Sequence, residues 1–177
     1  MKKILLFSLL VLTFAACKKE NDPDVRDSFV GTYDLSVDMI LRGSSSNETI
    51  NGFLPDSLPY TFTDTLTIAK DESDMTKVNV SSKVYNCSAI VSGNHLLLES
   101  ENNPDMKINL GEVLGIQMLQ GVELPINYSM VHKTADLNEN VLTWHTDATG
   151  NGSVDVPMLG SISFNGSASL ENTATKK

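Results

Sequence analysis

Residues 33–41, YDLSVDMIL, decide the fold class of this chain. Apolar side chains occupy every second position, and most of the residues between them are aspartate or serine. Successive side chains of a β-strand point to opposite faces, so this alternation predicts a strand with one face in a core and the other in water. We expect Asp34, Ser36 and Asp38 to face water. The inward set is expected to be Tyr33, Leu35, Val37, Met39 and Leu41.

The same alternation returns in later segments. In residues 60–68, apolar side chains alternate with threonines, which are β-branched and tolerate the wet face of a sheet. Asp64 interrupts the apolar positions there, which indicates a bulge or the end of a barrel. Residues 122–130 and 162–170 show the pattern again. Shorter strands are predicted at residues 76–82, 83–92, 95–100, 106–110 and 140–146.

Turn-forming residues separate these segments. Ser92-Gly93-Asn94 predicts a tight hairpin turn, and residues 43–47 and 71–74 are interpreted as loops. Asn-Gly pairs accept positive φ angles and are interpreted as turns. These pairs stand at residues 51–52, 151–152 and 165–166, the second within a polar turn expected at 147–152. Residues 112–120 fit either a short helix or a strand.

About eight to ten antiparallel strands in one domain must protect their edges, and a closed barrel or a two-sheet sandwich does so. Gly31-Thr32-Tyr33 resembles the Gly-x-Trp opening of lipocalins and, more closely, the Gly-Thr-Tyr opening of calycin-like lipoproteins. The resemblance implies an all-β fold: a single antiparallel calycin-like β-barrel over residues 29–172, with a β-sandwich as the alternative. Tyr33 stands where lipocalins have Trp, and the single Trp144 lies far away. Residues 173–177 are expected to form a disordered tail.

The N-terminus has the anatomy of a secretory signal peptide. Two lysines precede an apolar stretch, residues 4–14, which is shorter than the roughly 20 residues that a spanning helix needs. Two alanines then stand directly before Cys17. This junction resembles the lipobox of bacterial lipoproteins. The resemblance implies removal of residues 1–16 and lipidation of the Cys17 sulfur.

A lipidated Cys17 predicts where the protein lies. Two or more acyl chains hold a protein firmly to a bilayer, so we expect an anchor in the bacterial outer membrane. Residues 17–28 are charged and contain proline, which favours a flexible tether. The lysine-acidic run after Cys17 also resembles the surface-export signal of lipoproteins in one Gram-negative phylum. That resemblance implies display at the cell surface.

Composition excludes some partners. The chain has 13 Lys and Arg against 22 Asp and Glu, and its pI is about 4.7. An acidic chain without basic clusters argues against nucleic-acid binding and against attraction to anionic lipid. Cys87 is the only cysteine besides Cys17, so lipidation of Cys17 leaves no internal disulfide. Cys87 stands in an apolar run, and we interpret it as a small buried hydrophobe.

The sequence contains no recognisable catalytic or metal-binding motif. His95, His132 and His145 are not spaced as a local ligand pair, although His132 shares the inner parity of its strand. A faint calcium-loop pattern from residue 147 lacks its closing acid, because Met158 stands there. We therefore expect no enzyme, no catalytic residues, no cofactor and no bound metal, with metal binding by His132 or His145 left open.

The expected function is non-catalytic binding. The calycin resemblance implies a small apolar or amphipathic ligand held in the barrel, at residues that the sequence does not identify. The alternative is a structural or interaction subunit at the cell surface, whose partner is a protein or a glycan. The acidic chain and the tether suit both.

We predict that Cys17→Ser blocks lipidation and leaves the precursor uncut, because the acyl group is attached through the thiol. Mass spectrometry of the membrane fraction from cells expressing each form would measure this. A mutant that has the wild-type mass and stays in the membrane would contradict the prediction.

Overall fold

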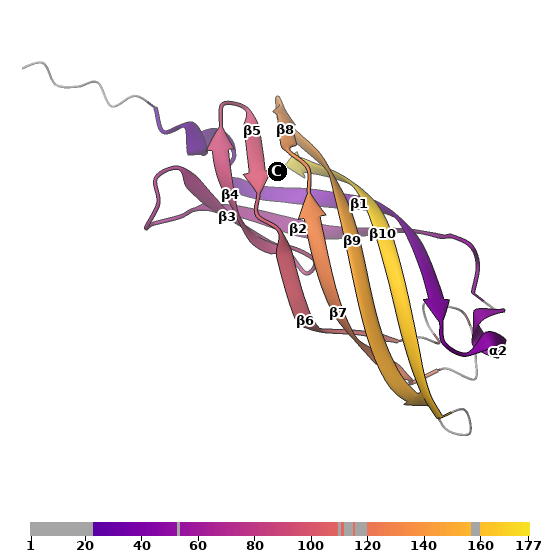
Figure 1. Ribbon diagram of the computed structural model, residues 1–177. Helices are drawn as coiled ribbons and strands as arrows, with labels where there is room; N and C mark the ends of the chain where they lie inside the picture. The colour runs from indigo at the N-terminus through magenta and orange to yellow at the C-terminus, as the bar shows by residue number, and fades with distance from the viewer. Residues whose placement is uncertain (1–22, 53, 110, 112–114, 116–119, 157–159) are drawn as a thin grey trace, which may run out of the picture.

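The computed structural model describes residues 23–52, 54–109, 111, 115, 120–156 and 160–177. Most of these residues lie in antiparallel strands, which confirms the all-β fold class (Figure 1). No helix in these ranges is long and apolar enough to cross a membrane. The elements are η1 (Val25–Ser28), β1 (Gly31–Ser45), α2 (Glu48–Asn51), β2 (Leu58–Lys70), β3 (Lys77–Ser81), β4 (Asn86–Ser92), β5 (His95–Leu98), β6 (Glu101–Asn109), β7 (Glu123–His132), β8 (Ala135–Asn138), β9 (Val141–Val156) and β10 (Gly160–Lys176).

The ten strands form one sheet that closes on itself. The strand order is β10-β1-β2-β3-β4-β5-β8-β9-β7-β6, and β9 also pairs with β10. Because the first and last strands of the chain are neighbours, the sheet forms a ring. The fold is therefore barrel-like, as predicted, and it is not a sandwich of two sheets.

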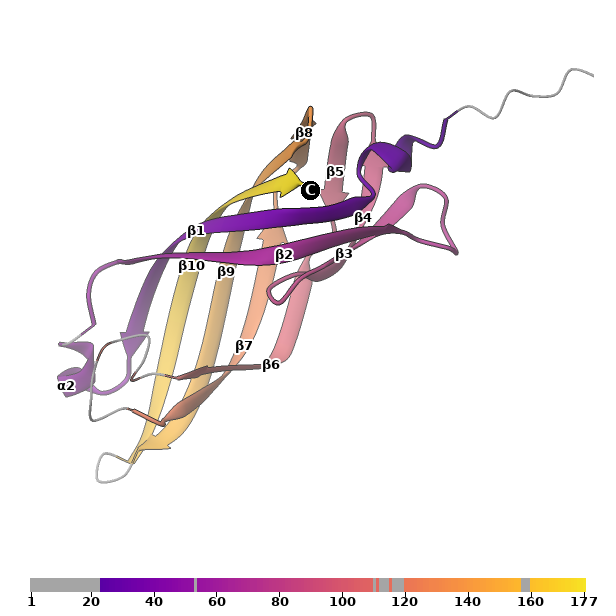
Figure 2. The same ribbon diagram turned by 180° about the vertical axis from the view of Figure 1, so that it is seen from behind.

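Strand length divides the ring into two halves (Figures 1 and 2). β3, β4, β5 and β8 have only 4 to 7 residues, whereas β1, β2, β9 and β10 have 13 to 17. We call the part enclosed by the short strands the closed half. The open half is the rest of the four long strands, together with β6 and β7. There, β6 and residues 58–66 of β2 have no described strand on their second side.

The closed half holds the main core. Tyr33, Leu35 and Val37 are at most 1 % exposed, while Asp34 and Asp38 lie in solvent and Ser36 is half-buried. The inward face predicted for the first strand is thus confirmed. Met39 and Leu41 lie on the same face but are only half-buried, because β1 has passed into the open half at that point.

The N-terminal segment packs against the closed half. Arg26 is only 5 % exposed. Its guanidinium pairs with Asp24 at 2.8 Å, and its Nη1 donates to the carbonyls of Asp71 and Asp74 between β2 and β3. The Tyr33 hydroxyl donates to the Phe29 carbonyl at 2.6 Å. The last residues of the predicted tether therefore belong to the folded domain.

Two predicted turns are wrong. The Asn-Gly pairs at 151–152 and 165–166 lie within β9 and β10, so the polar turn predicted at 147–152 is continuous strand. A Cβ atom on Gly152 would lie 2.2 Å from the Pro125 carbonyl oxygen of β7. Glycine is needed here for close approach of two strands and not for a reversal of the chain. Similarly, β1 continues through residues 43–45 of a predicted loop.

The predicted disordered tail is also wrong. β10 runs to Lys176, and Ala174 is fully buried opposite Leu35 of β1 and Leu142 of β9. The last residues complete the ring, so their backbone groups are paired on both sides. Residues 173–177 have small or polar side chains, so their sequence shows no apolar alternation, although their strand is central to the sheet.

Other local predictions hold. Gly93 and Asn94 form a two-residue hairpin loop between β4 and β5, with Gly93 at a φ of 64°. Asp64 lies where β2 leaves the closed half, and its carboxylate accepts the Lys83 N–H at 2.7 Å. The predicted signal peptide, Cys17 and most of the ambiguous segment 112–120 lie outside the described residues.

We predict that Ala174→Asp lowers the free energy of unfolding by about 3 kcal/mol or more, since it buries an unpaired carboxylate. Thr173→Asp, whose side chain faces solvent, should cost less than about 1 kcal/mol. Urea melts of a soluble form that begins at Pro23 would measure both. Equal midpoints for the two variants would contradict the burial of this segment.

Candidate functional site

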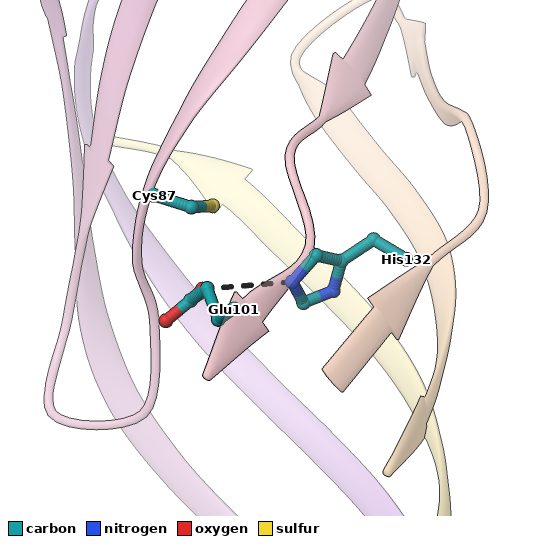
Figure 3. Close-up of side chains that lie close together, drawn as sticks. All are labelled: Cys87, Glu101 and His132. Atoms are coloured by element: carbon teal, nitrogen blue, oxygen red, sulfur yellow. Dashed lines mark ion pairs between the residues drawn. The ribbon is translucent and has the colours of Figure 1, made fainter. Parts of the chain in front are cut away.

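Polar side chains interrupt the core where the closed half meets the open half. Cys87 lies near the start of β4, Glu101 is the first residue of β6 and His132 is the last residue of β7. Figure 3 shows the Glu101 and His132 side chains pointing toward one another, with Cys87 beside them. One ligand atom from each residue lies within 4.8 Å of the other two. We call these three residues the Cys–Glu–His cluster.

Strand register explains how the cluster forms. Glu101 pairs with Met130, and His132 is two residues further along β7, so both side chains point inward. Cys87 shares the inner parity of β4 with the buried Ala89. No ladder joins β4 to β6, but the Asn86 N–H donates to Glu101 Oε2 at 3.0 Å. The cluster therefore lies between two strands that backbone hydrogen bonds do not connect.

The facing atoms of Glu101 and His132 are buried without hydrogen bonds. The His132 side chain is 0 % exposed and that of Glu101 is 9 % exposed. Glu101 Oε1 and His132 Nε2 lie 3.5 Å apart, and neither has a hydrogen-bond partner; the same holds for Trp144 Nε1. Buried polar atoms in folded proteins nearly always have partners, so these atoms require an explanation.

A hydrogen-bond network holds the other side of the His132 ring. His132 Nδ1 lies 3.0 Å from Thr146 Oγ1, which also accepts a hydrogen bond from the Asn172 amide at 3.3 Å. The Tyr85 hydroxyl donates to Asn172 Oδ1 at 2.6 Å. The Tyr85 ring also makes edge contacts with His132 and Trp144, each with 5.5 Å between ring centroids. The imidazole is therefore fixed in orientation before anything binds.

Burial sets the ionisation of the site. It raises the pKa of the Cys87 thiol far above its usual value, and the Glu101 carboxylate raises it further. Burial also acts to raise the pKa of Glu101, but contacts with His132, the Asn86 N–H and Cys87 outweigh it, so that this pKa is lowered. Burial raises the pKa of Tyr85 to about 12. Near neutral pH the site thus holds a thiol, a carboxylate and a phenol.

The other histidines lie elsewhere. His95 is exposed and pairs with Asp136. His145 lies on the outer face between Asp147 and Glu171, at 3.0 and 2.7 Å, and these carboxylates raise its pKa. Sequence reasoning placed His132 inward but did not identify Glu101. No local signal could have done so, because its partners come from β4 and β7.

A second feature is the inner face of the open half. The main core and a smaller apolar cluster, which includes Leu124, Ile162 and Phe164, are separated along the strands. Between them, Gly43, Gly166 and Gly150 face one another in register, and the preceding row is Leu41, Ala168 and Ala148. The glycines and alanines of these two rows are too small to join the two clusters. Tyr60, on the inner parity of β2, stays 53 % exposed.

The outer face of the same strands carries an open hollow of about 640 Å³. Gly150, Gly166 and Tyr128, which stand on the inner parity of their strands, also line it. The lining side chains of the outer face are neutral and polar, and they are Asn102, Asn127, Ser129, Thr149, Asn151 and Asn165.

No protein-family model and no curated protein matches this sequence. Arguments about function therefore rest on the residues themselves.

We predict that Cys87 reacts with iodoacetamide at least about tenfold more slowly than a free thiol at neutral pH, because only the thiolate attacks. The measurement would use the soluble form that begins at Pro23, which has no other cysteine. Unfolding in urea should restore the rate of a free thiol. Equal rates in the folded and unfolded protein would contradict the burial of the thiol.

Proposed function

We propose that the protein is a lipid-anchored, non-catalytic binding protein of the bacterial cell envelope. Its ligand is a small apolar or amphipathic molecule that lies on the inner face of the open half, between the two apolar clusters. The observation that carries this proposal is the incomplete burial of apolar side chains on this face, where Tyr60 stays 53 % exposed and Met39 and Phe62 are half-buried.

Apolar side chains on several strands of this face support an apolar ligand. Met39, Phe62 and Tyr128 border it from three different strands and are half-buried. The rings of Tyr60 and Phe62 lie 6.0 Å apart between centroids. Each Å² of apolar surface that a ligand covers contributes about 25 cal/mol to the free energy of binding. A lipid-like chain could therefore bind here through apolar contacts alone.

The cellular location in this proposal rests on sequence alone. The Ala15-Ala16-Cys17 junction is the feature that favours a lipid anchor in the outer membrane, and the charged run after it favours surface display. A surface-anchored binding protein would meet its ligand outside the cell.

The hollow on the outer face favours a second candidate, which is an interaction subunit that binds a glycan. Its amide and hydroxyl side chains offer hydrogen-bond donors and acceptors without charge. A neutral sugar needs groups of this kind. The two candidates use opposite faces of the same strands and can therefore be separated by mutation.

We predict that anilinonaphthalene sulfonate binds the soluble form saturably and that a long-chain fatty acid displaces it. Ala168→Phe should weaken binding at least about tenfold, because the new ring fills the inner face between Leu41 and Ala148. Ser167→Phe adds the same ring on the outer face and should leave the dissociation constant unchanged.

Fluorescence titration of each variant, with a urea melt to confirm folding, would measure both effects. Unsaturable binding of the probe, or equal weakening by the two variants, would contradict the inner-face proposal. If only Ser167→Phe weakened binding of a surface glycan, the second candidate would be supported, since Ser167 pairs with Thr149 beside the outer hollow.

A further inference from the structure

We propose that Cys87, Glu101 and His132 bind a zinc ion inside the sheet. The site is separate from the ligand face proposed above and does not depend on it. Three donors of different chemistry converge from β4, β6 and β7, each within 4.8 Å of the other two (Figure 3). Two of the three side chains are nine-tenths buried or more, and each presents an unpartnered atom to the other.

The spacing of the facing atoms fits a shared cation. Glu101 Oε1 and His132 Nε2 lie 3.5 Å apart. Two ligands on a tetrahedral zinc ion, at about 2.0–2.2 Å from the metal, lie about 3.4 Å from one another. A direct hydrogen bond between an imidazole N–H and a carboxylate is shorter, at about 2.7–2.9 Å. The observed separation fits two ligands of one ion and is longer than a direct hydrogen bond.

The contact at His132 Nδ1 supports the same conclusion. Thr146 Oγ1, 3.0 Å from Nδ1, can accept a hydrogen bond from the Nδ1–H tautomer. His132 Nε2 is then available to ligate an ion, and it faces Glu101 Oε1 at 3.5 Å. A metal-binding histidine usually has its other nitrogen hydrogen-bonded in this way.

A backbone contact orients Glu101, and the donor set favours zinc over other cations. The Asn86 N–H holds Glu101 Oε2 at 3.0 Å and leaves Oε1 for the ion. Sulfur, nitrogen and oxygen donors together suit zinc, whereas magnesium and calcium take oxygen ligands. The Cys87 thiol loses its proton when it ligates the ion, and the proton passes to solvent. Three protein ligands leave a fourth position for water.

A bound ion would also have a structural effect. Cys87 lies on β4, and the other two ligands lie on the β6–β7 pair, which no ladder connects to β4. The ion would cross-link the sheet at that gap. Anything that binds only the folded state raises its stability, so zinc should raise the melting temperature of the protein.

The test uses the full-length chain in detergent, stripped of metal with a chelator and carrying no polyhistidine tag. Cobalt is added as a spectroscopic probe, followed by zinc. We expect one cobalt per chain, a thiolate-to-cobalt charge-transfer band in the near ultraviolet, and displacement by zinc but not by magnesium. Cys87→Ser should abolish the band, and Glu101→Gln or His132→Gln should weaken binding at least about tenfold. Cys17→Ser and His145→Gln are the matched controls and should leave the charge-transfer band and the affinity for cobalt unchanged.

Several results would overturn the proposal. They are the absence of cobalt and zinc binding at micromolar concentration, binding without a thiolate band, and equal affinity in wild type and the three ligand variants. Loss of binding in His145→Gln would assign the ion to the outer-face carboxylates Asp147 and Glu171. If a ligand variant fails to fold, the wild-type band and its loss on alkylation of Cys87 decide the question.

Discussion

Closure of the sheet by β10 is the constraint on which the rest of the structure depends. Residues 164–175 of β10 pair with β1 along one side and with β9 along the other, so this stretch has no free edge. Unpaired edges invite aggregation, and a closed ring removes them where it closes. This closure encloses the main core. It also sets the curvature that brings β4 opposite β6 and β7, and so brings Cys87 near Glu101 and His132.

The buried polar groups inside the ring lie at one position along its axis. β5 ends at Leu98, shortly before β6 begins, and β7 ends at His132, shortly before β8 begins. The pairing of β5 with β8 and that of β6 with β7 are therefore interrupted at nearly the same position along the ring axis. Asn172 is buried there but satisfied, since its amide meets the Trp144 carbonyl and Thr146 Oγ1. Burying a polar group costs free energy unless it is paired. The structure therefore concentrates its polar atoms where the backbone ladder is interrupted, and leaves apolar layers on either side.

Period-two patterns revealed the strands whose inner faces are large and apolar. Residues 33–37 are the plainest case, because bulky buried side chains alternate with polar ones. The period-two pattern was lost where the inward side chains are small. Gly150, Gly152 and Gly166 are extended strand residues on the inner face, yet adjacent asparagines made them resemble turns. The burial of Ala174 was not predicted because its side chain is also small.

Tertiary position explains what the sequence could not show of the candidate site. Cys87, Glu101 and His132 are spread over 46 positions of the chain, and their meeting depends on how the ring closes. The inward direction of His132 was readable from parity alone. The gap between β4 and β6 was not readable, because it arises from the unequal lengths of strands that lie far apart in sequence.

The two ends of the described chain meet at the closed half. The Lys177 N–H donates to the Thr32 carbonyl at 3.0 Å, and Lys176 Nζ reaches the Ser28 carbonyl. The far end of the open half, with α2 beside it, lies at the opposite pole of the molecule (Figure 1). Any attachment at either terminus, whether a lipid or a fused domain, is thus made at one pole. The glycine-lined part of the inner face then lies in the half of the molecule away from that pole.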